Sequence, residues 1–310
     1  MGDLVAKRYP AKLFANLADH TYVECGTGGK GWACWGGKNG GTELRRATGS
    51  TIRANAIAEP DEHAGITCYL INGVCHQAAN RILLPASITV RGARGYEVSE
   101  ALFGTYGRPG GFLGMCSAPF DQHSGTVGDS PECTAVAMKM VRRKRTGKRR
   151  LRTQPRARVR VATPAERKYL KGVLAIYQQA RRPLKSAMHA RKFALGRDLV
   201  AFHLDLFMHQ VDYKLDSRVD RKTDRRLREI RRSTERSRQK MEQWLVNRHM
   251  TPAEFVHEFD AETKVFQHAL AGALKRTQYS KLLDLPPDRV VTLADPRIVR
   301  RVFTKTAFKR

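Results

Sequence analysis

Acidic residues are scarce in this sequence, and long apolar runs are missing. The 310 residues include 29 Asp and Glu against 57 Lys and Arg, a formal net charge of +28. No stretch is apolar for long enough to cross a membrane as a helix. The start, MGDLVAKRYP, has neither the apolar core nor the cleavage site of a secretory signal, and Ala6 stands where a myristoylation signal needs Ser or Thr. We therefore expect a cytoplasmic protein, which could also be delivered as an effector.

The cysteines lack the spacing of a zinc site. All six lie in the first 140 residues, and none belongs to a Cys-x-x-Cys pair. A structural metal is therefore not expected, and nothing in the sequence calls for a cofactor. Without a secretory signal the thiols should be reduced, so disulfides are not expected either.

Charge and glycine divide the chain into two parts. Residues 1–140 hold 13 Lys and Arg against 12 Asp and Glu, which leaves 44 against 17 for residues 141–310. Glycine follows the same division, with 21 of 25 before residue 141. We predict an α+β domain over 1–138, a basic linker over 139–162 and a basic α-helical domain over 163–310.

Short strands and one helix are predicted in the first part. DHTYVECGTGGKGWACWGG, residues 19–37, has two β-prone runs around a glycine-rich turn, typical of a hairpin. Residues 38–62 look like an exposed connection. AGITCYLI at 64–71 predicts a strand, Asn72-Gly73 predicts a turn, and VCHQAANRILL predicts a helix. After it, SITVRGARGY predicts another strand, and the residues that follow predict a loop. The predicted fold is a small antiparallel sheet with a helix that begins near a cysteine.

The second part is predicted to be helical. Two segments have the signature of a capped helix start: Thr163-Pro164-Ala165-Glu166 and Thr251-Pro252-Ala253-Glu254. Each has a threonine that can cap the helix, a proline at the first helical position and a glutamate whose side chain can accept a hydrogen bond from the backbone amide of the capping threonine. Between them, apolar residues recur at helical spacing, and a long arginine-rich amphipathic helix is expected over 216–248. Its Arg and Glu residues could pair along the helix, but they leave a surplus of positive charge.

Cys75 is the candidate nucleophile. It lies where the Asn72-Gly73 turn meets the predicted helix, and free amides at a helix start favour the thiolate. A base is also needed, and His20, His63 and His123 are the candidates. His76 is adjacent in sequence but points about 100° away on a helix, so we expect it to shape the site instead. Gln77 and Asn80 complete a predicted polar, substrate-binding surface.

The order of a histidine at the start of a strand (DHTYVEC) before a cysteine at the head of a helix (NGVCHQAANRIL) resembles the circularly permuted papain-like cysteine hydrolases. These include lecithin:retinol-acyltransferase-like enzymes and bacterial cell-wall-type amidases. Over roughly residues 15–115, the resemblance implies Cys75 as nucleophile, His20 as general base and backbone amides at the helix head as oxyanion donors. The family often places a polar orienting residue after the base, and GWACWGG offers none. His63 is the preferred substitute, ahead of Glu24, Asp61 and Glu62.

Two alternatives remain open. If His123 is the base, the order becomes that of forward papain-like enzymes, with Asp121 or Asp129 as the orienting residue. If Cys75 is inert, the protein is a non-enzymatic nucleic-acid-binding protein. In either case the basic region 139–310 predicts a polyanionic partner, either nucleic acid or an anionic membrane surface. A protein or peptide substrate would suit the cysteine chemistry.

Overall fold

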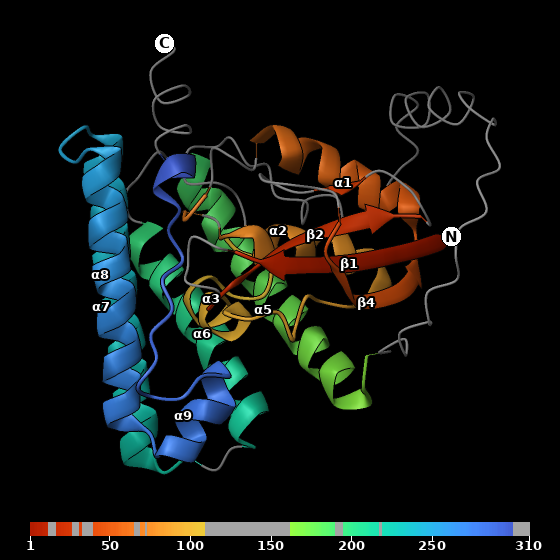
Figure 1. The fold of residues 1–310 in the computed structure, drawn as a ribbon. Coiled ribbons are helices and arrows are strands. Elements are labelled where there is room, and N and C mark those ends of the chain that lie inside the picture. Colours follow the sequence, from red (N-terminus) through yellow and green to blue (C-terminus); the bar gives the residue numbers. More distant parts are fainter. Residues whose placement is uncertain are drawn as a thin grey trace.

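The computed structural model describes residues 1–11, 17–26, 31–32, 40–64, 69–71, 73–108, 162–189, 195–216 and 219–299. The fold is mixed α and β, as predicted, with a small antiparallel sheet and many helices (Figure 1). The strands are β1 Gly2–Pro10, β2 Asp19–Cys25, β3 Gly31–Trp32 and β4 Thr42–Gly49. The helices are α1 Thr51–Ala64, α2 Cys75–Leu83, α3 Tyr96–Phe103, α5 Pro164–His189, α6 Leu195–Leu215, α7 Arg221–Val246, α8 Pro252–Ala273 and α9 Arg276–Leu283, with a short 3₁₀ turn at Leu84–Ala86.

The sheet has the strand order β3-β2-β1-β4, and every neighbouring pair is antiparallel. The predicted hairpin is present as β2 and β3, with Val23 opposite Trp32. Because side chains alternate along a strand, Leu4 and Ala6 of β1 reach the face where α1 and α2 pack. This layer places the first residue of α2 beside β2, which is the arrangement on which the candidate site depends (Figure 1).

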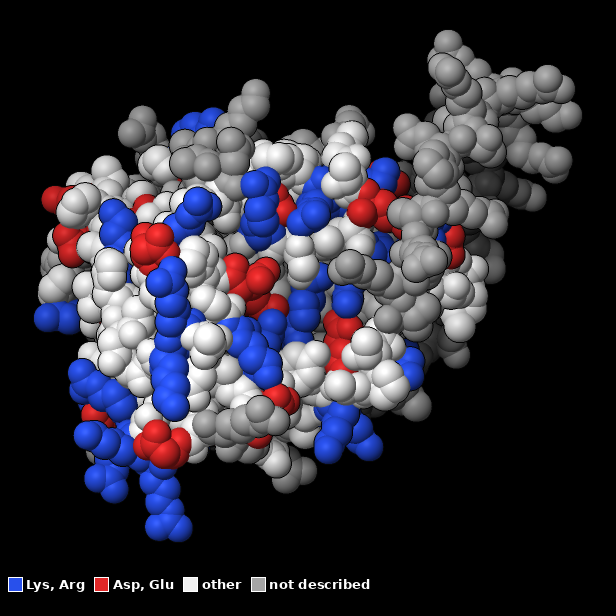
Figure 2. All heavy atoms as spheres, turned by 60° about the horizontal axis from the view of Figure 1, so that its bottom comes forward, with Lys and Arg blue, Asp and Glu red and all other residues white. Residues whose placement is uncertain are grey.

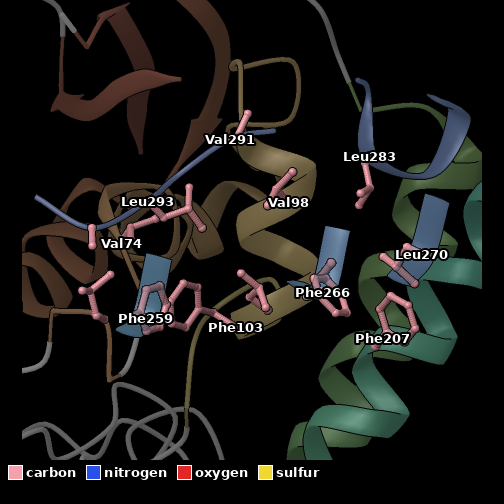
Figure 3. Close-up of a cluster of buried hydrophobic side chains, with 14 of the residues drawn as sticks. Val74, Val98, Phe103, Phe207, Phe259, Phe266, Leu270, Leu283, Val291 and Leu293 are labelled. Atoms are coloured by element: carbon pink, nitrogen blue, oxygen red, sulfur yellow. The ribbon is translucent and has the colours of Figure 1, made fainter. Parts of the chain in front are cut away.

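Helix α3 joins the first part of the chain to the helical part. Val98, Leu102 and Phe103 of α3 share one apolar cluster with residues of α6, α7, α8 and α9 and of the segment that follows α9. The rings of Phe103 and Phe259 stack with centroids 5.9 Å apart. Figure 3 shows how side chains from both parts of the chain, Val74 and Val98 among them, meet those of Phe266, Leu270 and Leu293. The domain boundaries stay predictions, but the two parts share a hydrophobic core.

A buried charge cluster strengthens the same junction. Glu235 of α7 accepts hydrogen bonds from Arg108 (3.1 Å), Arg231 (3.2 Å) and Arg238 (3.0 Å), and all four side chains are at most 1% exposed. Arg231 and Arg238 also donate to the carbonyl of Leu102, the next-to-last residue of α3. Glu242 of α7 pairs with Arg108 as well. The end of α3 is therefore held to α7 by charge-assisted hydrogen bonds in addition to apolar contacts.

The capped helix starts were predicted correctly. Thr163 Oγ1 accepts from the amide of Glu166 at the start of α5, and Thr251 and Glu254 form a reciprocal capping box at the start of α8. The long arginine-rich helix is α7, shorter at both ends than the predicted 216–248. Its first turn is capped by Asp220, which accepts from the amide of Thr223.

Several predictions in the first part were wrong. Residues 38–62 are no exposed connection, since β4 and α1 occupy most of them. The described part of the predicted strand 64–71 forms only an isolated bridge between Tyr69 and Gly73. SITVRGARGY is a loop with one isolated bridge, because Asn80 Oδ1 accepts from the amide of Val90 where a neighbouring strand would. Part of the predicted loop after it is helix α3.

Candidate functional site

Cys75 is the first residue of α2, and its sulfur lies against the start of β2. Sγ is 3.8 Å from the backbone carbonyl of Asp19, to which the thiol donates. The preceding residue, Val74, is extended, and the side chain of Gln77 accepts from its amide (3.0 Å), which fixes the first turn. Gly73 makes this approach possible: its φ is +131°, and a Cβ there would lie 2.6 Å from Gln77 Cβ. Cys75 thus lies at the start of a helix, as the sequence suggested.

Hydrogen-bond donors surround the sulfur. The backbone amides of Cys75, His76 and Thr21 and the hydroxyl of Thr21 all favour the thiolate. Thr21 Oγ1 is buried and has no hydrogen-bond partner among the residues that the structure describes, so its hydroxyl is uncommitted in this conformation. Burial opposes these donors and dominates, because it raises the pKa of the Cys75 thiol to about 11. Contrary to the expectation of a lowered pKa at the helix start, the resting thiol is protonated at neutral pH.

His76 locks this region together. Its Nε2 lies 3.0 Å from the carbonyl of Asp19, and its Nδ1 lies 2.9 Å from Ser99 Oγ on α3. Burial lowers the pKa of His76 to about 4, with His20 contributing in the same direction, so the ring is neutral. Since the Asp19 carbonyl only accepts, the proton of the neutral ring is on Nε2. His76 therefore positions α2 against β2 and α3, and it is 1% exposed.

His20 follows Asp19 directly in β2. Its ring centroid is 4.8 Å from that of Tyr9, the residue opposite it on β1, and its side chain is buried. Alternation places His20 and Tyr22 on one face of β2 and Thr21 on the other, as the sequence predicted for His20 and Tyr22. Among the described residues, Cys75 Sγ makes no hydrogen bond to an imidazole nitrogen. The start of β2 thus brings the Asp19 carbonyl to the thiol, while the ring of His20 packs on the opposite side of the strand.

Gln77 and Asn80, predicted to contact a substrate, are committed to the protein itself. Besides its contact with the Val74 amide, Gln77 donates to Ser99 Oγ and to the carbonyl of Gly104. Asn80 donates to Tyr96 and to the carbonyl of Thr105. Both side chains are fully buried. These amides hold the loops around α2 in place, and neither is available to a ligand in this conformation.

Most of the other predicted site residues lie wholly or partly outside the described residues. His63 lies in the last turn of α1 instead of ahead of a strand, and its side chain is outside the described residues. His123, Asp121 and Asp129 also lie outside them, as does the linker 139–161. Of the orienting candidates, Glu24 is placed: it forms an ion pair with Lys7 at 2.6 Å.

Sequence reasoning missed two residues of the site, Asp19 and Thr21. The carboxylate of Asp19 accepts from Arg94 and Arg8, which lowers its pKa despite burial, and its carbonyl contacts both Cys75 and His76. Strand alternation could have drawn attention to Thr21, because it shares the helix-covered face of β2 with Val23. The role of the Asp19 carbonyl depends on long-range packing that no local pattern encodes.

The described residues contain no group of three or more His, Cys, Asp or Glu side chains that could hold an ion. Cys25 and Cys75 are free thiols, and burial raises the pKa of Cys25 to about 12.

Within the described part of the chain, no helix is both long and apolar enough to cross a membrane.

The comparisons with known proteins leave the site to be judged on this geometry. No family model matches the chain, and searches of curated proteins and of solved structures find no similar protein.

Proposed function

We propose that this protein is a cysteine-nucleophile hydrolase or acyltransferase that acts on an amide or thioester bond, with Cys75 as nucleophile. The observation that carries the proposal is the position of Cys75 Sγ at the head of α2, 3.8 Å from the Asp19 carbonyl, with the uncommitted Thr21 hydroxyl and nearby backbone amides that favour the thiolate. A buried structural cysteine needs no such donors, because a neutral thiol is a weak acceptor that packs like a small apolar group. Donors aimed at sulfur stabilise the anion through which a thiol attacks.

The proposed reaction is an acyl transfer through a thioester. Cys75 Sγ attacks the substrate carbonyl while a base removes the thiol proton, and the free amides at the start of α2 stabilise the oxyanion. The proton then passes to the leaving amine or thiol, and the acyl group remains on sulfur. Water completes hydrolysis, or another acceptor completes a transfer.

His20 is the base in this proposal. Both ring nitrogens of His76 already have partners, so His76 cannot take the thiol proton without losing one of them. His20 belongs to the same strand segment as the carbonyl that contacts the sulfur, but its ring packs against Tyr9 on the opposite face, so the proposal requires a rearrangement at the start of β2 before His20 takes the thiol proton. Because the resting thiol has a raised pKa, proton removal and attack occur together, without a stored thiolate.

Alkylation by iodoacetamide, followed peptide by peptide as a function of pH, tests the proposal. In the unmodified protein, the rate at Cys75 should rise with the ionisation of an imidazole, at a pH well below the pKa of the thiol. In His20→Gln, the rate should instead follow the thiol's own pKa, about 11. Cys25 is the internal control: it lies at the end of the same strand, its thiol pKa is raised to about 12, and His20→Gln should leave its rate unchanged.

A second measurement separates reactivity from catalysis. A burst of p-nitrophenol from p-nitrophenyl acetate, with acetate trapped on Cys75, is expected for the protein and for Cys25→Ser, and should be absent in Cys75→Ser. If Cys75 reacts as slowly as Cys25 near neutral pH and no acyl group is trapped, the enzyme proposal fails. The protein would then be the non-enzymatic nucleic-acid-binding alternative, with an inert Cys75.

A further inference from the structure

Helix α7 sorts its charges between an inner and an outer face. Its sequence has ten Arg and Lys and four Asp and Glu. Two of the four acids, Glu235 and Glu242, are at most 1% exposed and are bound by arginines in the buried cluster. Acids that the sequence alone would assign to pairs along the surface are therefore turned inward, where they neutralise none of the outer charge.

The outer face keeps most of the positive charge. The remaining acids, Asp224 and Glu229, pair with Arg228 at 2.8 Å and with Arg226 at 3.5 Å. Arg225, Arg232 and Arg236 are exposed, and none of them forms an ion pair with a carboxylate that the structure describes. The exposed cations of the outer face are Arg221, Lys222, Arg225, Arg226, Arg232, Arg236 and Lys240. Figure 2 shows Lys and Arg side chains on the side of the molecule where Figure 1 places α7 and α8, and others spread over the rest of the same face.

The three arginines that form no ion pair with a described carboxylate lie in a row. With 3.6 residues per turn, Arg225, Arg232 and Arg236 fall on one stripe of the helix, and Lys240 continues it, so the row spans about 22 Å at a rise of about 1.5 Å per residue. Trp244 lies beyond its end, 39% exposed, and Lys240 Nζ is 4.5 Å from the centroid of its ring. An exposed indole at the end of an arginine row is a combination that packing does not require.

We infer that this outer face of α7 binds the phosphate backbone of single-stranded nucleic acid. Phosphates follow one another at about 3.4 Å along each strand of a duplex and further apart in an extended single strand, so a row of this length still faces several of them, and the guanidinium fork suits phosphate oxygens. Unstacked bases, which only a single strand offers freely, can stack on the indole of Trp244. The inference does not depend on the cysteine chemistry.

The same geometry disfavours a membrane surface as the partner. A helix that lies on a bilayer inserts an apolar face between the headgroups. Four apolar residues of α7 are buried in the protein core: Leu227, Ile230, Met241 and Leu245. The outer face offers charge with one indole, which fits a polyanion in solution better than an acyl layer.

Binding of fluorescein-labelled oligo-dT and oligo-U to the full-length protein, followed by anisotropy across a salt series, tests the inference. The variant R225Q/R232Q/R236Q removes three phosphate contacts, so the slope of log K against log salt should become shallower by about 2, at about 0.7 per contact. Extrapolated over one decade of salt from 1 M, this corresponds to binding about 100-fold weaker at 0.1 M. Trp244→Phe should remove the quenching of indole fluorescence that accompanies base stacking.

The matched control is R167Q/K168Q/K171Q, which removes three exposed cations from α5 and changes the net charge equally. The slope of log K against log salt for this control should differ from that of the unmodified protein by less than about 0.7, the value of one phosphate contact. Equal weakening by both triple variants would assign binding to the general field of the protein and overturn the inference. An unchanged slope in the α7 variant, stronger binding to duplex than to single strands, or α7-dependent binding to phosphatidylserine vesicles would overturn it too. Cys75→Ala should bind normally, so this result is independent of the proposed enzyme activity.

Discussion

Removal of the Glu235 carboxylate should destabilise the protein far more than removal of any exposed acid of α7. Glu235→Gln keeps one acceptor oxygen but takes away the charge on which three buried guanidinium groups converge. Each charge-assisted hydrogen bond contributes about 1.5–3 kcal/mol. A plain sum overstates the loss, because Arg231 and Arg238 keep the Leu102 carbonyl and Arg108 keeps Glu242.

The charge balance sets the expected magnitude. With His203 neutral, since burial lowers its pKa well below the usual value, the cluster holds three positive and two negative groups. Glu235→Gln leaves three positive groups facing one negative group. Breaking a buried pair in this way costs about 3–5 kcal/mol, a large share of the roughly 5–15 kcal/mol by which a protein is stable.

Urea unfolding followed by far-UV circular dichroism measures the free energy of unfolding. Glu229→Gln is the control, because Glu229 is an exposed acid of the same helix whose ion pair with Arg226 is surface-exposed, and its loss should cost less than about 0.5 kcal/mol. The melting temperature of Glu235→Gln should fall by roughly 6–20 °C. A free energy of unfolding within 0.5 kcal/mol of the unmodified protein would refute the view that this cluster holds α3 to α7.

Three further predictions concern the neighbourhood of Cys75 and the glycines. His76 is held neutral with a pKa of about 4, so between pH 6.5 and pH 4 the unfolded chain binds a proton that the folded protein does not bind. The free energy of unfolding should therefore fall by about 2 kcal/mol from pH 7 to pH 5. In urea titrations, His76→Gln should lose that portion of the pH dependence. Gly73→Ala should destabilise by about 1–3 kcal/mol, because φ is +131° and the new Cβ meets Gln77; a stability equal to that of the unmodified protein would contradict this account. Gly272→Ala, near the end of α8 with no atom within 4 Å of an added Cβ, should be neutral or stabilising by up to about 1 kcal/mol in the same assay.

Local signals predicted the helical part well and the sheet only partly. The caps at Thr163 and Thr251 and the apolar spacing of α6 and α7 are properties of short segments, so the sequence contains them in full. Strand β4 carries Glu43, Arg45 and Arg46 in its centre, and its charges are matched by distant partners such as Glu166 and Asp3. No alternation marks such a strand. Helix α1 was missed because Pro60 normally ends a helix, yet here it lies inside one.

The candidate site shows the same limit. A turn, a cysteine and a helix start are adjacent in the sequence, and they are adjacent in the fold. The polar character of Gln77 and Asn80 was equally visible, but a sequence does not distinguish an amide that awaits a ligand from one that binds a distant carbonyl. Their partners, at Gly104 and Thr105, are set by the loop after α3, whose position depends on the helical part.

The insertion of α3 among α6, α7 and α8 has a practical consequence for anyone who divides this chain. Fragments cut within 139–162 would each expose the apolar surface that now meets at Phe103 and Phe259. We expect the two pieces to reassemble into one noncovalent complex. Coexpression of both pieces should therefore give folded protein under conditions where either piece alone precipitates.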